Sequence, residues 1–241
     1  LIQFSGLVSI FGIFKKIDNK NKYYYFLLAI TSPIILFLSS TAKPQLFHIC
    51  SSVVVFSLYF LNNSKKLTTN EEKWKILLSL LILLVSVTAK FNFILSSFIL
   101  IIYIFYISIK NNSYKFFLYT SILIFLIFYL PIIFWKYLNL GGNFFQYLYS
   151  PVPLNILGLA EFKQYLVRYG GGTNYLKIIF PTNLNQISNS VGVAFCYIFL
   201  LNFRNKHVRI VFLMIISYLM LNYIFGQFIG RIFLEPLFWI L

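Results

Sequence analysis

Long apolar stretches alternate with short polar links along almost the whole chain. A helix needs about 20 mostly apolar residues to cross a bilayer, and most of these stretches approach that length. Apolar residues occur all round the helical wheel in each of them, as expected for helices that face lipid and one another. The pattern predicts about nine transmembrane helices, which cover residues 1–14, 23–41, 45–61, 76–89, 91–109, 116–135, 191–203, 210–226 and 232–241.

These stretches favour helices over a membrane β-barrel, whose strands alternate polar and apolar residues in segments of about ten. Composition agrees, because 60% of the residues are hydrophobic and only 10% are charged. We therefore expect an all-α fold, a polytopic transmembrane helical bundle made by residues 1–241, and we place it in a bacterial inner membrane. The first and last helices begin or stop within apolar sequence, so we expect both to be truncated and the chain to be a fragment of a longer membrane protein.

The formal net charge of +15 lies in the links, and its distribution predicts the orientation of the chain. Thirteen of the 20 Lys and Arg residues fall in one alternating set of links, and seven fall in the other. Cytoplasmic loops carry an excess of Lys and Arg, so we place the richer set in the cytoplasm. It comprises residues 15–22, 62–75, 110–115 and 204–209. Because the charge is spread over short loops, it indicates a membrane protein better than a nucleic-acid-binding one.

The opposite, outward side has tight turns and one long loop, residues 136–190. Within this loop, residues 155–169 place apolar side chains at helical spacing and charged ones elsewhere on the wheel. This pattern predicts a short amphipathic helix in the outer membrane interface. Two prolines precede it and the glycine run 170–172 follows it, and such residues are typical of the two ends of a helix.

Lone cations stand on the outward side. Lys43 and Lys90 end the same Thr-Ala-Lys turn in two successive hairpins, and Arg231 precedes the last apolar stretch. An ammonium group binds phosphate as a point charge. We therefore expect Lys43, Lys90 and Arg231 to bind the phosphate of a lipid substrate together. The alternative is that these side chains only extend from helix ends to the membrane surface.

Only two of the five acidic residues lie on the outward side, Glu161 and Glu235. Glu235 follows Arg231 by four residues, so both occupy one helix face. Charges at membrane depth cost several kcal/mol unless they pair or meet water, which makes such residues functional candidates. We interpret Glu235 and Glu161 as candidates for orienting an acceptor, and the catalytic base stays unassigned. The alternative is that Glu235 only neutralises Arg231.

Metal-binding side chains are scarce. The chain has two His and two Cys, and together with the five acids they are too scattered to predict a metal cluster. A single carboxylate together with substrate oxygens is still able to hold a divalent ion. His48, one turn inside the third apolar stretch, is interpreted as a packing residue that forms a hydrogen bond.

Four segments resemble the GT-C superfamily of membrane glycosyltransferases, whose PMT-like family 39 uses polyprenyl-phosphate sugar donors. The segments are SSTAKPQLFHICSSVVVFSLYF, LLVSVTAKFNFILSSFILIIYIF, GGNFFQYLYSPVPL and GQFIGRIFLEPLFWIL. The resemblance implies transfer of a sugar from a polyprenyl-phosphate donor to a glycan, lipid or protein acceptor on the outer face, in cell-envelope synthesis. It also implies that the catalytic acid lies in a first outward loop. Nothing in the chain matches that loop, so we expect it upstream of Leu1.

Other membrane functions fit parts of the same pattern. A transporter or flippase for lipid-linked saccharides predicts helices broken by Gly or Pro at mid-membrane, and Pro33 and Pro131 do interrupt apolar stretches. An O-antigen polymerase or ligase shares the many spans and the large outer loop. A structural scaffold is the fourth interpretation, against which the placement of Arg231 and Glu235 argues.

Overall fold

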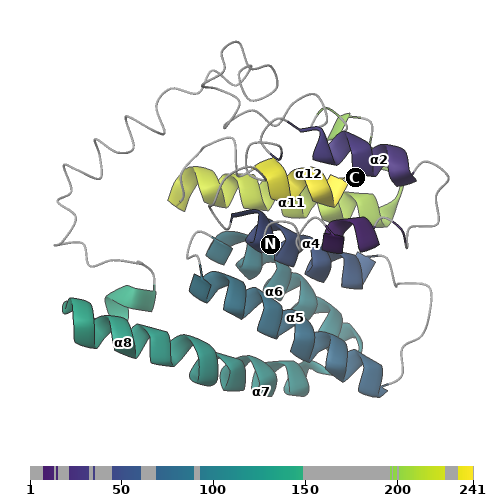
Figure 1. The fold of residues 1–241 in the computed structure, drawn as a ribbon. Coiled ribbons are helices and arrows are strands. Elements are labelled where there is room, and N and C mark those ends of the chain that lie inside the picture. Colours follow the sequence, from purple (N-terminus) through teal and green to yellow (C-terminus); the bar gives the residue numbers. More distant parts are fainter. Residues whose placement is uncertain are drawn as a thin grey trace, which may run out of the picture. The chain divides into compact units, whose positions relative to one another are not determined.

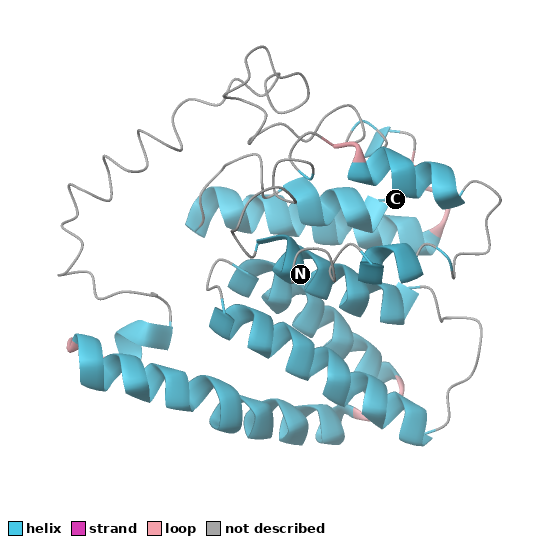
Figure 2. Cartoon of the chain, in the orientation of Figure 1, coloured by secondary structure: helices cyan, strands magenta, loops and turns pink. Residues whose placement is uncertain are grey.

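The computed structural model of the chain describes its helical parts. The described residues are 8–13, 15, 22–32, 35, 45–60, 69–89, 93–148, 196, 198–199, 201–225 and 233–240. They form helices and turns and contain no strand (Figure 2), so the predicted all-α fold class is confirmed for them. The chain divides into two compact units, which are described separately below. The first combines Leu1–Ser64 with Gly172–Leu241, and the second is Lys65–Gly171.

The second unit is built on three helices that pack against one another (Figure 1). They are α5 (Thr69–Ala89), α6 (Ile94–Lys110) and α7 (Tyr114–Ile124). Two contacts show that α5 and α7 run parallel. Glu72 contacts Ser113 at one end of the pair, and Val87 shares a hydrophobic cluster with Tyr129 at the other end. The end of α6 and the start of α7 therefore lie beside the start of α5.

A long helix continues from α7 through the π-helical turn η2 (Phe125–Tyr129) into α8 (Leu130–Leu140). The sequence predicts a shorter helix at 116–135, interrupted by Pro131. Proline lacks an N–H group and its ring clashes with the carbonyl four residues earlier. The helix widens into a π turn directly before Pro131 and so continues past it. It ends at Gly141, whose φ of 69° is easily adopted only by glycine.

The short 3₁₀ helix η3 (Phe144–Leu148) follows and packs against α8. Tyr147 is almost fully buried there, with 1% of its surface exposed, and its hydroxyl donates a 2.6 Å hydrogen bond to the Gly141 carbonyl. Tyr147 joins Val87, Tyr129 and Ile133 in one buried cluster. The chain after the long helix therefore starts by folding back onto it.

In the first unit, residues 8–13 are helical, and longer helices follow (Figure 1). They are α2 (Lys22–Ile30), α4 (Gln45–Phe60), α11 (Lys206–Phe225) and α12 (Leu234–Ile240). α12 packs against both α4 and α11. The predicted span 23–41 begins close to α2, which ends at Ile30, and a turn follows at Thr31 and Ser32, next to the interruption that the sequence indicates at Pro33. A proline at position 33 explains the ending, since the residue before a proline disfavours helical geometry.

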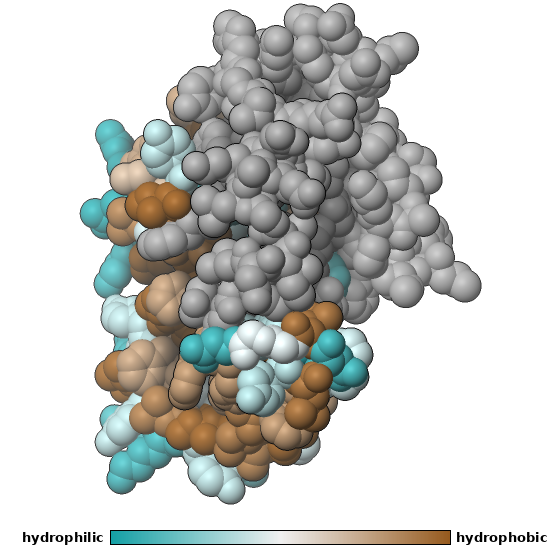
Figure 3. Space-filling model, turned by 90° about the vertical axis from the view of Figure 1, so that its left-hand side faces the viewer, coloured by the Kyte–Doolittle hydropathy of each residue, from teal (hydrophilic) through white to brown (hydrophobic). Residues whose placement is uncertain are grey.

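Two helices among the described residues are long and apolar enough to cross a bilayer. Tyr114–Leu140 has 27 residues and Lys206–Ile224 has 19, which correspond to about 40 Å and about 28 Å at 1.5 Å per residue. Two shorter apolar helices are His48–Phe60 and Ile94–Lys110. Many large hydrophobic side chains are exposed, and hydrophobic residues cover much of the described surface on the face shown in Figure 3. Length and composition thus indicate membrane association.

Candidate functional site

The structure describes one of the five side chains that the sequence selects as site residues, Glu235. The other four, Lys43, Lys90, Glu161 and Arg231, lie outside the described residues. The shared phosphate site of the three cations and the pairing of Arg231 with Glu235 therefore stay predictions. Glu235 is the residue on which a candidate site is built.

Glu235 lies in the first turn of α12, where a negative charge is favoured by the helix dipole. Pro236 beside it suits the start of a helix, where an N–H group is not needed. Every side chain from Leu234 to Trp239 is buried, and only 2% of the Glu235 surface is exposed. Burying a carboxylate costs several kcal/mol unless partners compensate. Such an acid in so apolar a chain is a functional candidate.

Trp239 lies one helical turn after Glu235, on the same face of α12. Its ring stacks on Phe56 of α4, with centroids 5.7 Å apart and an interplanar angle of 11°. The Trp239 ring also contacts Tyr218 of α11, with ring centroids 5.7 Å apart and an interplanar angle of 58°. The Trp239 indole N–H is buried and has no hydrogen-bond partner in the described part of the chain. Trp239 therefore joins three helices and still offers one donor.

α11 contributes two buried polar side chains to the same place. Tyr218 and Asn222 are four residues apart and 5% exposed each, and the Asn222 amide donates a 2.9 Å hydrogen bond to the Tyr218 backbone carbonyl. Trp239 links Tyr218 to Glu235, because its ring contacts the Tyr218 ring and it stands one turn after Glu235 on α12. We call Phe56, Tyr218, Asn222, Glu235 and Trp239 the Glu235 cluster.

α4 carries further buried polar residues, but its own backbone satisfies two of them. The Ser52 hydroxyl donates to the Ile49 carbonyl at 2.9 Å, and the Ser57 hydroxyl donates to the Val54 carbonyl at 2.8 Å. Small hydroxyls bonded in this way pack like apolar groups. His48 is 3% exposed, as expected of a packing residue.

The Glu235 cluster combines a carboxyl, a phenol, an amide and an indole with aromatic ring faces. Such groups bind hydroxyls by hydrogen bonds, and aromatic rings supply flat apolar contact area. Among the residues that the structure describes, no three His, Cys, Asp or Glu side chains gather closely enough to hold a metal ion. The cluster is therefore suited to orienting a polar group rather than to assembling a metal centre from its own side chains.

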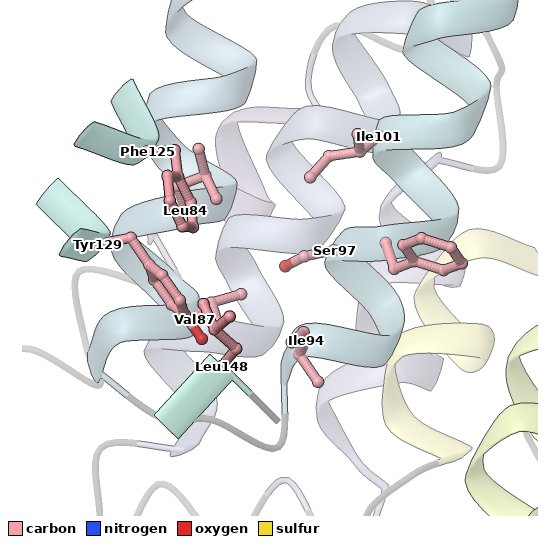
Figure 4. A pocket seen from close by; sticks show the side chains of 9 residues that line it. Leu84, Val87, Ile94, Ser97, Ile101, Phe125, Tyr129 and Leu148 are labelled. Carbon is pink, nitrogen blue, oxygen red and sulfur yellow. The ribbon is translucent and has the colours of Figure 1, made fainter. Parts of the chain in front are cut away.

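The second unit has a different feature, an apolar pocket of about 200 Å³ between α5, α6, η2 and η3. Figure 4 shows Val87, Tyr129 and Leu148 close together on one side and Ile94, Ser97 and Ile101 from α6 on the other. Both Phe125 and Tyr129 belong to the π turn, which therefore shapes one wall. Almost all lining groups are hydrocarbon, so the pocket suits an apolar chain and offers little chemistry.

Comparison with known proteins identifies the family. The family model described as the DUF1420 N-terminal domain matches residues 1–241. The chain belongs to this family. No curated protein and no solved structure matches the chain. For this DUF1420 N-terminal domain, the resemblance to GT-C glycosyltransferases remains a prediction.

The sequence identified Glu235 in the DUF1420 N-terminal domain but missed its partners. Tyr218, Asn222 and Trp239 look like ordinary members of apolar stretches, and nothing local distinguishes them from the many other aromatic residues. One signal was available, because Tyr218 and Asn222 are spaced four apart and so share a helix face. The same spacing relates Glu235 to Trp239. These spacings show which face of each helix carries the polar groups, but they do not show that the two helices meet.

Proposed function

We propose that this domain is the membrane-embedded part of a glycosyltransferase in which the Glu235 cluster orients the acceptor. The observation that carries the proposal is the burial of Glu235 in α12, the helix whose Trp239 packs against Tyr218. A carboxyl is expensive to bury in apolar surroundings, and aromatic faces beside it suit a sugar. The four segments similar to GT-C enzymes give the proposal its reaction class.

The proposal places the chain in a bacterial inner membrane as a multi-pass helical bundle. Two helices of sufficient length, Tyr114–Leu140 and Lys206–Ile224, support this location, and so does the hydrophobic share of 60%. Further predicted spans lie partly outside the described residues. The outward side, with the loop 136–190, would then face the acceptor.

Sugar transfer needs a bond from an acceptor oxygen to the anomeric carbon of the donor. The bond from that carbon to the phosphate oxygen breaks, and the phosphate leaves with the electron pair. In this proposal Lys43, Lys90 and Arg231 stabilise the negative charge on the leaving phosphate, as preorganised cations do. Glu235 accepts a hydrogen bond from an acceptor hydroxyl and so fixes its direction. The base that takes the acceptor proton remains unassigned.

One observation also favours a second function, a transporter or flippase for lipid-linked saccharides. A buried carboxyl among membrane helices is a common proton- or ion-coupling group, and Glu235 meets that description. The π turn at Phe125–Tyr129, directly before Pro131, is a local irregularity in a long apolar helix, and irregular helices are a further feature shared with transporters. The two functions differ in whether the sugar leaves its carrier.

Proteoliposomes with a labelled polyprenyl-phosphate sugar separate the two functions. The full-length protein is reconstituted with donor and a crude cell-envelope acceptor, and both free carrier and labelled product are measured. The proposal predicts that label moves from the carrier to the acceptor. Movement of intact donor across the bilayer, without cleavage, would instead support the transporter. Neither cleavage nor movement with any polyprenyl donor would contradict both.

A further inference from the structure

Three helix ends meet at one end of the second unit. They are the start of α5, the end of α6 and the start of α7. The Ser113 hydroxyl donates to the Glu72 carboxylate at 2.6 Å and also lies 3.3 Å from the Ser108 carbonyl. One serine before α7 thus contacts both neighbouring helices. The groups around it are held in fixed relative positions.

The exposed charge at this end is mainly positive, although Glu71 in the first turn of α5 is exposed as well. Lys73, Lys110 and Lys115 are exposed, and the Lys73 ammonium lies 5.8 Å from the centre of the Phe116 ring. The Glu72 carboxylate is engaged by Ser113. Burial lowers the pKa of Lys75, and the charge of Glu72 partly offsets this effect. Lys75 and Glu72 therefore interact within the unit, which leaves the three exposed lysines facing outward.

Exposed aromatic side chains stand beside two of these lysines, and exposed aliphatic ones lie further along α5 and α7. Trp74 is 63% exposed and Tyr114 is 39% exposed, each adjacent in sequence to an exposed lysine. One helical turn further, about 5.4 Å along the axis, Leu78 and Leu118 are exposed as well. Lysine together with Trp or Tyr at a helix end, and aliphatic residues one turn further in, are typical of the place where a helix enters a membrane.

We propose that this end of the unit, formed by Lys73, Trp74, Lys110, Tyr114 and Lys115, binds the phosphate headgroups of acidic phospholipids in a bilayer. Charge complementarity selects this partner, since anionic lipids attract basic residues next to the membrane. The aromatic side chains lie at headgroup level and the aliphatic ones lie in the acyl chains. The inference rests on the membrane location proposed above and not on sugar transfer.

Binding is measured with the full-length protein in detergent, titrated with phosphatidylglycerol and, separately, with phosphatidylcholine. We expect tighter binding of phosphatidylglycerol. The triple variant Lys73→Gln, Lys110→Gln, Lys115→Gln should bind it about 100-fold more weakly, because each lysine near a lipid surface contributes about fivefold. Replacing the same three residues by arginine should retain binding, since the charge is kept.

A second triple variant controls for net charge. Arg204, Lys206 and Arg209 are exposed in the first unit, and changing all three to glutamine removes the same charge elsewhere. We expect it to lose less than tenfold in affinity. Equal binding of the two lipids by the wild type, or equal losses in both glutamine variants, would overturn the proposal. Competition by inorganic phosphate at millimolar concentration would show a free-anion site instead, which also overturns it.

Failure of this proposal is distinguishable from failure of the proposed function. Extraction of native membranes with alkaline carbonate tests whether the chain is embedded at all, independently of lipid preference. If the chain stays in the membrane pellet but shows no preference for phosphatidylglycerol, only the headgroup site is wrong. If the chain is released as a peripheral protein, the membrane location fails and both proposals fail with it.

Discussion

The Ser113 hydroxyl lies 2.6 Å from the Glu72 carboxylate and donates a hydrogen bond to it, although 41 residues separate the two in sequence. This contact fixes the start of α7 beside the start of α5, and the parallel packing of the two helices follows from it. Hydrogen bonds to a charged acceptor are stronger than neutral ones. The pair is only partly buried, which limits its contribution.

We predict that Ser113→Ala and Glu72→Ala each lower the stability of the protein by about 1 kcal/mol, less than a fully buried bond to a charged group, because the pair is only partly buried. The double variant should cost little more than either single one, because both remove the same contact. Denaturant unfolding in detergent measures the three values. The control Glu71→Ala changes the neighbouring exposed acid and should cost about 0.5 kcal/mol or less. Additive losses would show that the contact carries no coupling energy.

Two glycines give a matched pair in which only the backbone differs. A Cβ at Gly12 or at Gly141 would meet nothing within 4 Å, so neither substitution causes a clash. Gly12 lies in a helical segment, and Gly12→Ala should stabilise it by up to about 1 kcal/mol. Gly141 has a φ of +69°, and Gly141→Ala should destabilise the protein by about 1 kcal/mol or more. Thermal melting of both variants checks the opposite signs, and equal shifts would contradict the conformational argument.

Trp239 should be the largest single packing contribution in the Glu235 cluster. It contacts Phe56 and Tyr218 at 5.7 Å each and is 4% exposed. Truncation of a buried tryptophan to alanine costs about 3–5 kcal/mol. We therefore predict a melting temperature at least about 6 °C lower for Trp239→Ala.

Trp135→Ala is the matched control for Trp239→Ala, because the Trp135 side chain on α8 is 60% exposed. We expect its melting temperature to change by only about 2 °C or less, since exposed substitutions rarely exceed about 0.5 kcal/mol. Similar losses for both tryptophans would mean that Trp239 is not buried between α4, α11 and α12.

The sequence predicted the helices well where apolar stretches are bounded by charged or turn residues. The predicted 45–61 and 91–109 agree closely with α4 and α6. α5 begins earlier than predicted, at Thr69, because Glu71 and Glu72 are favourable in a first turn. Hydropathy alone does not register that effect. At Pro131 the sequence predicts an interruption of the helix, but the helix continues through a π turn to Leu140.

The candidate site was less predictable, for a physical reason. Periodicity shows which face of a helix is apolar, but in this chain apolar residues surround every helix, so the pattern does not say which helices touch. The contact of Trp239 with both Phe56 and Tyr218 depends on which helices pack against α12. Glu235 was recognisable only because acids are so rare here.

The central claim is that the buried Glu235 carboxyl serves chemistry rather than packing, and Glu235→Gln tests it most directly. Glutamine keeps the shape and removes the charge, so folding should persist while transfer from a polyprenyl-phosphate sugar falls by about 100-fold or more. Size-exclusion chromatography and the melting temperature verify folding, and Glu71→Gln, which changes an exposed acid, should keep wild-type turnover. A well-folded Glu235→Gln protein that transfers sugar at the wild-type rate would contradict the claim.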